Sequence, residues 1–453
     1  MISFLPLGGA GEIGATSFYL NINGTGIILD CGMHPKKRGK ESLPRFDLLE
    51  NKNLDYVLIS HAHQDHINAL PFLIKKFPYL RIITTPQTRA IAELTLHNAI
   101  SILRREFPDE EIYTHEEADL LIQSIDYKSY NEKFFIKGFS SSTSDSVEVE
   151  FFDAGHILGS AGIFLKFQNI KIFFTGDINL NSQSLHTGAN LPNEKVDVLI
   201  TESTYGATDS SNLNSWEKEI VRLASAINKT LANGGSVLIP VFALGKLQEM
   251  LATVWKLMFK NKIPTVDIYT GGIGTKLSRV YDYNRYVINY KNTNLVLHDI
   301  PQKNVNEISD LNMFFKNPSI VLASSGMMVQ STTSFELAKA WLAQKNSAII
   351  TVGYIDYETP GYKISTAKKG ELIDFTGTGN STEIKCEIFN FRFSAHSTRE
   401  DLLAIVKRLN PEKIIIVHGD ENAIGWLGAK IMSQNPGKKV YAPNNCDGIQ
   451  FDI

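Results

Sequence analysis

Six residues near the start of the chain constrain it more than any other feature. They read HAHQDH, at positions 61–66, and directly follow an apolar run that predicts a buried strand. In an extended chain, side chains two positions apart point the same way, so His61 and His63 can bind one ion together. Asp65 and His66 lie where the chain turns and can face a second ion. Imidazoles with a few carboxylates suit zinc better than magnesium or calcium, so the motif predicts a zinc site.

The composition is that of a soluble globular protein, with 43% hydrophobic and 21% charged residues. Because the net charge is −3, any contact with nucleic acid must come from a local patch. Three scattered cysteines, Cys31, Cys386 and Cys446, fit a reducing compartment better than a disulfide framework. The first residues show no signal-peptide pattern, and no apolar run approaches the ~18 residues that a bilayer requires. We therefore expect a cytoplasmic protein with no membrane partner.

A chain of 453 residues is longer than a domain with one ordinary hydrophobic core, so two domains are expected. Short apolar runs of strand length dominate the first part of the chain. Strands then alternate with helices, such as a predicted helix over 216–231 and another over 243–260, which is typical of a parallel α/β unit. We predict an α/β fold in which a domain formed by residues 1–206 and 389–453 is interrupted by a smaller α/β domain over residues 207–388.

Four further motifs occur in the order that the metallo-β-lactamase superfamily shows, and the chain resembles that superfamily along its whole length. The motifs are LDCG, FFDAGH, FTGD and IVHGD, which contribute Asp30, His156, Asp177 and His418. The resemblance implies an αββα sandwich. It implies that Asp30 orients a ligand histidine, that His156 joins the first ion and that Asp177 bridges both ions. His418 would complete the second site. Taken singly, each of these residues is more often structural.

Two zinc ions would lower the pKa of a shared water and leave a net positive site, which attracts a phosphodiester anion. The leaving oxygen still needs a proton, and an imidazole titrates near working pH. The resemblance points to His396, in FSAH, as the general acid, and to Glu202, in LITEST, as the carboxylate that holds it. It counts Asp65 with these two as a catalytic residue. Alone, Glu202 and His396 would each more often be ordinary residues.

Within the superfamily the chain resembles the β-CASP nucleases, the group that contains the pre-mRNA 3′-end endonuclease and RNase J. Glu202 matches motif A, the FSAH segment at 393–396 matches motif B, and His418 matches motif C, where DNA-processing members typically carry valine. The resemblance implies a zinc-dependent ribonuclease for single-stranded RNA, endonucleolytic and with 5′→3′ exonuclease action as a further mode. Motif B is commonly followed two residues on by aspartate, and Thr398 at this position puts the positioning of His396 in doubt.

Two segments outside the metal motifs are candidates for substrate binding. Ser324, Ser325 and Gly326 follow a predicted buried strand in the insertion and resemble a family signature, and such a turn can offer amides and hydroxyls to a phosphate. A simple strand-to-helix turn is the alternative. Lys37 lies in the basic run KKRGK shortly after Asp30 and can contact RNA phosphates. A solvated loop is nearly as plausible an interpretation.

Two other functions stay open at this point. The same metal centre could hydrolyse DNA or a small phosphoester, and only the family pattern at His418 argues against DNA. A non-catalytic RNA-binding partner is the third interpretation, but such relatives have lost ligands that this chain retains. The resemblance also allows a homodimer.

Overall fold

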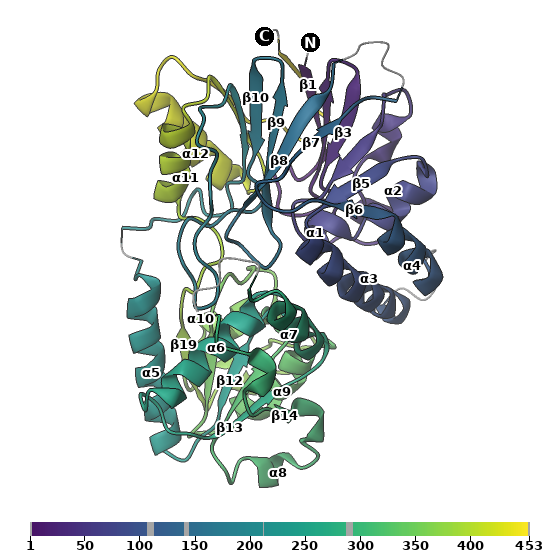
Figure 1. Cartoon of the computed structure of the whole chain (residues 1–453). Coiled ribbons are helices and arrows are strands. Elements are labelled where there is room, and N and C mark those ends of the chain that lie inside the picture. Colours follow the sequence, from purple (N-terminus) through teal and green to yellow (C-terminus); the bar gives the residue numbers. More distant parts are fainter. Residues whose placement is uncertain (1, 107–112, 140–144, 212, 287–292, 452–453) are drawn as a thin grey trace. The chain divides into compact units, whose positions relative to one another are not determined.

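The computed structural model describes residues 2–451 with the exception of 107–112, 140–144, 212 and 287–292. The chain divides into two compact units, which are described separately here (Figure 1). The first unit comprises Met1–Asn181, Gly188–Ser211 and His396–Ile453, and the second comprises Ser182–Thr187 and Asn212–Ala395. The second unit thus takes in a short segment, residues 182–187, that the sequence did not assign to the insertion.

The first unit contains two seven-stranded sheets. The first sheet has the order β22 (Ile449–Phe451), β1 (Ile2–Gly8), β2 (Ser17–Ile22), β3 (Thr25–Leu29), β4 (Tyr56–Leu58), β5 (Arg81–Thr84) and β6 (Ile125–Tyr127). The second has the order β21 (Lys439–Tyr441), β20 (Lys413–Ile416), β11 (Val198–Thr201), β10 (Ile170–Phe174), β9 (Ala161–Phe167), β8 (Val147–Asp153) and β7 (Lys133–Ile136). The helices are α1 (Gln64–Ile67), α2 (Leu70–Lys76), α3 (Pro86–Glu106), α4 (His115–Ser124), α11 (Arg399–Leu409) and α12 (Glu421–Gln434).

The alternation of side chains between the two faces of each strand explains how the two sheets pack. Successive strand side chains point to opposite faces, and in β10 Ile172 and Phe174 belong to the core that also contains Phe18 and Leu20 of β2 in the other sheet. Phe173, which lies between them, belongs instead to a second core with residues of α11 and α12. Figure 1 shows α2, α3 and α4 beside the first sheet. The predicted αββα order is therefore confirmed.

The second unit is built on a six-stranded parallel sheet. Its order is β14 (Lys303–Asn304), β13 (Asp267–Thr270), β15 (Ser319–Ala323), β12 (Val237–Pro240), β16 (Ala348–Thr351) and β19 (Glu387–Asn390), with a separate pair of β17 (Leu372–Ile373) and β18 (Thr382–Glu383). The helices are α5 (Trp216–Ala232), α6 (Lys246–Phe259), α7 (Ile273–Tyr283), α8 (Leu311–Phe314), α9 (Thr333–Leu342) and α10 (Pro360–Thr366). Buried Trp341 packs on this sheet with Leu238, Val321 and Ile349.

The helix predicted over 243–260 begins three residues later than expected. Gly245 adopts a positive φ of 83° immediately before Lys246, the first residue of α6. This backbone conformation suits glycine and does not continue a helix, so it sets the helix start. Among the helices that the structure describes, none is both long enough and apolar enough to cross a membrane.

Strand direction brings distant segments to one edge of the first unit. β3 and β4 are parallel neighbours in the first sheet, and β10, β11 and β20 are parallel neighbours in the second. The predicted site residues Asp30, His61, Asp177, Glu202 and His418 all follow the carboxyl ends of these strands. In open α/β sheets, ligand sites form where carboxyl ends of parallel strands meet.

We expect the core between the two sheets to dominate the stability of the first unit. Phe18 is fully buried, and its ring lies 5.5 Å from Phe4 and 5.9 Å from Phe174, centroid to centroid. The substitution Phe18→Ala should lower the free energy of unfolding by about 3–5 kcal/mol, because it removes burial and leaves a cavity. Leu120→Ala is the control, since Leu120 is 67% exposed and should cost less than about 0.5 kcal/mol. Equal urea midpoints for the two variants would contradict this assignment of the core.

Candidate metal centre and active site

The HAHQDH motif turns sharply from β4 into α1. His61 and His63 lie in the turn, and Asp65 and His66 lie in α1, which begins at Gln64. The neighbouring loop approaches this turn so closely that a Cβ at Gly32 would lie 1.7 Å from the carbonyl oxygen of Asp65. Only glycine fits there, so the glycine of the LDCG motif permits the packing that holds the histidine motif in place.

The first group of predicted ligands converges as one cluster. Its members each offer a ligand atom, and these atoms lie within 4.8 Å of one another: His61, His63, His156 and Asp177. Nε2 of His61 and Nε2 of His156 each lie 3.1 Å from Nδ1 of His63. Oδ2 of Asp177 lies 3.5 Å from Nε2 of His61 and 3.6 Å from Nε2 of His156.

The second group forms a cluster beside the first. Ligand atoms of Asp65, His66 and His418 also lie within 4.8 Å of one another. Oδ1 of Asp177 lies 3.4 Å from Nε2 of His66 and 3.3 Å from Nδ1 of His418. The two oxygens of Asp177 therefore face different clusters, which is the arrangement that a bridging carboxylate requires.

A buried network orients two of the imidazoles. Asp30 is fully buried and accepts hydrogen bonds from the backbone N of Ser60 at 2.6 Å, from Oγ of Ser60 at 2.7 Å and from Nδ1 of His66 at 2.8 Å. Oγ of Ser60 also lies 3.0 Å from Nδ1 of His61. With both Nδ1 atoms engaged, Nε2 of each ring is directed toward the clusters. Sequence reasoning missed Ser60, although it directly precedes the motif.

Two residues of the centre hold an unusual backbone conformation. Asp30 has a φ of 61° and His418 a φ of 48°, both in the left-handed region that costs free energy for residues other than glycine. Backbone hydrogen bonds hold them there: the backbone N of Asp30 donates to the carbonyl of Leu58, and that of His418 donates to the carbonyl of Gly9. Oγ1 of Thr204 also lies 3.2 Å from Nδ1 of His418. Thr204 was also missed by sequence reasoning. Such strain is concentrated at functional sites.

The charges of this centre fit a bound cation. Burial lowers the pKa of His61 and His63, so both rings are neutral and can donate a lone pair. Burial alone would also lower the pKa of His66, but Asp177, Asp65 and Asp30 raise it to about 10. A raised pKa means that the carboxylates create a potential that favours positive charge.

Two buried atoms also lack the partners that such atoms normally have. Nε2 of His66 and Oδ1 of Asp177 lie 3.4 Å apart, but neither atom forms a hydrogen bond with a residue that the structure describes. Buried polar atoms are rarely left unsatisfied, so each points to a ligand. Imidazole nitrogens and a few carboxylate oxygens are the donors that zinc prefers. The residues present therefore fit a metal centre.

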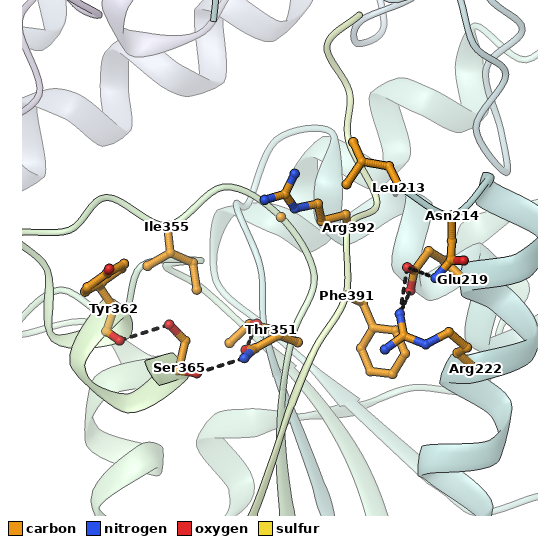
Figure 2. A pocket seen from close by; sticks show the side chains of 12 residues that line it. Leu213, Asn214, Glu219, Arg222, Thr351, Ile355, Tyr362, Ser365, Phe391 and Arg392 are labelled. Atoms are coloured by element: carbon orange, nitrogen blue, oxygen red, sulfur yellow. Dashed lines mark hydrogen bonds and ion pairs between the residues drawn. The ribbon is translucent and has the colours of Figure 1, made fainter. Parts of the chain in front are cut away.

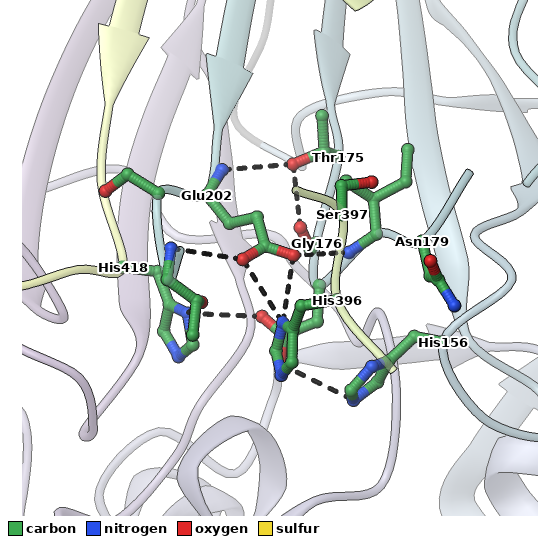
Figure 3. Close-up of polar contacts among 12 residues, drawn as sticks. His156, Thr175, Gly176, Asn179, Glu202, His396, Ser397 and His418 are labelled. Carbon is green, nitrogen blue, oxygen red and sulfur yellow. Dashed lines mark hydrogen bonds and ion pairs between the residues drawn. The ribbon is translucent and has the colours of Figure 1, made fainter. Parts of the chain in front are cut away.

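His396 and Glu202 meet beside the metal centre, although 194 residues separate them in the chain. Nδ1 of His396 lies 3.0 Å and 3.2 Å from the two carboxylate oxygens of Glu202 (Figure 3). Glu202 is 1% exposed, and its Oε1 also accepts a hydrogen bond from the backbone N of Ile178 at 2.8 Å. Burial would lower the pKa of His396, but Glu202 raises it to about 9. Nε2 of His396 lies 4.0 Å from Oδ2 of Asp177.

Thr398 serves the following helix. Its Oγ1 accepts a hydrogen bond from the backbone N of Asp401 at 3.2 Å, and the carboxylate of Asp401 accepts one from the backbone N of Thr398 at 3.0 Å. This reciprocal pair is a capping box that starts α11. Threonine at this position thus caps the helix that begins at Arg399, three residues after His396, while Glu202 holds the imidazole.

The contacts of the predicted substrate-binding residues involve residues other than the candidate metal ligands. Nζ of Lys37 pairs with Glu12 at 2.6 Å. Ser324, Ser325 and Gly326 directly follow β15 in the second unit, and Oγ of Ser325 accepts a hydrogen bond from the backbone N of Val329 at 3.2 Å. These contacts close the turn and a surface loop. A role in substrate binding stays a prediction for all four residues.

Comparison with known families agrees with this geometry. Residues 10–223 match the "Metallo-beta-lactamase superfamily", 247–364 match the "Beta-Casp domain", and 381–443 match the "Zn-dependent metallo-hydrolase RNA specificity domain". A crystal structure of a protein of unknown function from Enterococcus faecalis shares the fold, with a TM-score of 0.60 and 14% identity over 99% of both chains. Fold and site together define a metallo-hydrolase of the metallo-β-lactamase superfamily.

Relatives narrow the assignment. An "RNase J-like protein" of Methanocaldococcus jannaschii is 31% identical over 91% of both chains. "Cleavage and polyadenylation specificity factor 73" of Drosophila melanogaster is 29% identical over 100% of this chain. "Endoribonuclease ysh1" of Schizosaccharomyces pombe is 29% identical over 98% of this chain. The chain spans 65% and 58% of the length of these two relatives. The chain belongs to the β-CASP family.

The network around Asp30 leads to a test of metal affinity. Asp30→Asn keeps the size of the side chain but replaces one acceptor with a donor, so it should disturb the orientation of His66. We expect affinity for Zn²⁺ to fall about 10–100-fold, measured by competition with a chelator. Asp126→Asn, at an exposed ion pair with Arg81, is the matched control. Unchanged affinity in the Asp30 variant would show that the network does not support the metal ligands.

Proposed function

We propose that this protein is a two-zinc ribonuclease that hydrolyses phosphodiester bonds of single-stranded RNA. The observation that carries the proposal is the position of Asp177, whose two oxygens face two clusters of imidazoles beside the His396–Glu202 pair. The names of the relatives, an RNase J-like protein and an endoribonuclease, support the same reaction.

The two clusters define which residues would hold each ion. His61, His63 and His156 would hold the first ion, and Asp65, His66 and His418 the second, with Asp177 shared. When bound, the ions supply Lewis acidity and lower the pKa of water toward ~7. The positive charge of the two ions would also favour an anionic phosphodiester as substrate.

The chain supplies the proton for the leaving oxygen. Glu202 holds Nδ1 of His396, so Nε2 is the atom that can pass a proton toward the reacting group. The buried carboxylate also favours the protonated imidazole, which is the form that a general acid needs. Glu202 acts through His396 and is therefore a positioning residue.

RNA is favoured over the other candidate substrates. The matches to an RNA-specificity domain and to named endoribonucleases support RNA, and His418 occupies the position where DNA-processing relatives typically carry valine. A non-catalytic RNA-binding role is disfavoured, because every predicted ligand is present and lies within its cluster.

The general-acid assignment has a direct test. His396→Ala should reduce RNA cleavage by roughly 10²–10⁴-fold, because the leaving oxygen loses its proton donor. Elemental analysis should still find about two zinc ions per chain, since His396 is not among the proposed ligands. His298→Ala, at an exposed histidine of the second unit, is the control and should cleave at the wild-type rate. A wild-type rate for the His396 variant would overturn the assignment.

Substrate class is tested with matched oligonucleotides. End-labelled single-stranded RNA and DNA of one sequence, with 5′-hydroxyl, 5′-monophosphate or 5′-triphosphate ends, should be incubated with the zinc-loaded protein and resolved on a gel. We expect cleavage of the RNA, and the product lengths distinguish internal from terminal cleavage. Preferential cleavage of DNA, or hydrolysis of small phosphodiesters alone, would reverse the proposal.

A further inference from the structure

The second unit carries a surface pocket with a volume of about 350 Å³ (Figure 2). This size lies in the range of small-molecule sites. Its walls come from α5, the ends of β16 and β19, and α10, and include Arg222, Tyr362, Asn390 and Arg392. All of these residues belong to the second unit.

One side of the pocket is electrically balanced. The Glu219 carboxylate is 3% exposed and accepts hydrogen bonds from Nη1 of Arg222, at 2.7 Å to each oxygen, and from Nδ2 of Asn214 at 2.9 Å. The Arg222 guanidinium also lies over the ring of Phe391, 4.9 Å from its centroid. The charges of Glu219 and Arg222 therefore compensate each other.

The positive charge of Arg392, in contrast, is not compensated. Its side chain is exposed, and none of the hydrogen bonds or ion pairs within the described part of the chain involves it. Figure 2 draws no contact from Arg392 to the other lining residues. Among the described residues of the lining, Glu219 is the only carboxylate, and it is already paired with Arg222. The pocket consequently carries one uncompensated positive charge, and an anion is the ligand that such a charge attracts.

Tyr362 adds a flat apolar surface to the same pocket. It is 41% exposed, and neither its ring nor its hydroxyl has a partner among the described residues. Asn390, which also lines the pocket, is fixed at both ends: its Oδ1 accepts from Oγ1 of Thr351 at 2.6 Å, and its Nδ2 donates to the carbonyl of Ser365 at 2.8 Å. The pocket thus presents one exposed aromatic ring and one unpaired guanidinium, whereas Glu219, Arg222 and Asn390 already bind other residues.

We propose that this pocket is a nucleotide-binding subsite for the RNA substrate, in which Arg392 contacts a backbone phosphate and Tyr362 stacks on a base. A positively charged group and an aromatic ring that line one groove are the combination that binds single-stranded nucleic acid. The inference rests on the proposed function. Only three residues separate Arg392 from His396, so chain connectivity alone limits the distance between their Cα atoms to about 14 Å. The subsite would therefore hold a nucleotide close to the cleaved bond.

The test measures RNA binding and its dependence on salt. A fluorescently labelled single-stranded 12-mer should be titrated with the zinc-loaded His396→Ala protein, in which the RNA stays intact, between 50 and 300 mM salt, by anisotropy. Adding Arg392→Ala should weaken binding about tenfold, the loss expected for one charged hydrogen bond. It should also flatten the slope of log K against log [salt] by ~0.7, the value for one phosphate contact on a single strand.

Conservative and remote variants separate binding from folding. Arg392→Lys should restore the salt slope because the charge is kept. Tyr362→Ala should weaken binding at least about fivefold and Tyr362→Phe should not, since stacking needs the ring and not the hydroxyl. Arg279→Ala, at an exposed arginine of α7 outside the pocket, is the matched control and should bind RNA as the parent does. Thermal melting verifies that each variant is folded.

The possible outcomes are distinct. Unchanged affinity and salt slope in a folded Arg392→Ala variant would overturn the subsite and leave the proposed ribonuclease intact. The same holds if, in a parallel titration with free uridine monophosphate, this variant loses affinity for the mononucleotide and not for the 12-mer, because the pocket would then bind a free nucleotide and not the strand. Failure of the wild-type protein to bind or cleave RNA at all would overturn the proposed function itself, and the subsite with it.

Discussion

The site depends on one carboxylate that lies between two sets of imidazoles. Asp177 directs Oδ2 toward His61 and His156 and Oδ1 toward His66 and His418. Imidazoles and carboxylates this deeply buried would be costly without a compensating charge. The shared carboxylate makes the two clusters electrically interdependent, so neither cluster could be moved or neutralised without affecting the other.

Backbone amides and strand ends hold this arrangement in place. Asp30 and Glu202 are both buried, and each accepts a hydrogen bond from a backbone N, of Ser60 and of Ile178 respectively. Both carboxylates follow strands of the packed sheets, so the apolar core between the sheets fixes their positions. A site supported in this way by rigid elements has the preorganisation that catalysis needs.

The two units divide the chemistry of the proposed ribonuclease. The metal donors, His396 and Glu202 all belong to the first unit, whereas the surface pocket with Arg392 and Tyr362 belongs to the second. Fold alone does not specify a substrate, because function resides in the groups that a fold presents. In this family member, the reactive groups and the groups inferred to contact RNA are connected by three residues of chain between Arg392 and His396.

Regular elements of the fold could be predicted because their signals are local. The helix predicted over 216–231 is α5, and the short apolar runs of the first unit form strands of its two sheets. Contacts of single hydroxyls and surface charges could not be predicted. Ser60 and Thr204 hold ligand histidines, and Lys37 pairs with Glu12, because folding placed those partners within reach.

By itself, the sequence determined that candidate metal ligands lie close together at residues 61–66, because local backbone geometry sets the directions of neighbouring side chains. The more distant ligands were identified only through resemblance to a family. Tertiary structure alone decided that Glu202 contacts His396 and that Asp177 faces both clusters. These pairs are far apart in the chain, and only the packing of two sheets with their strand ends at one edge brings them together.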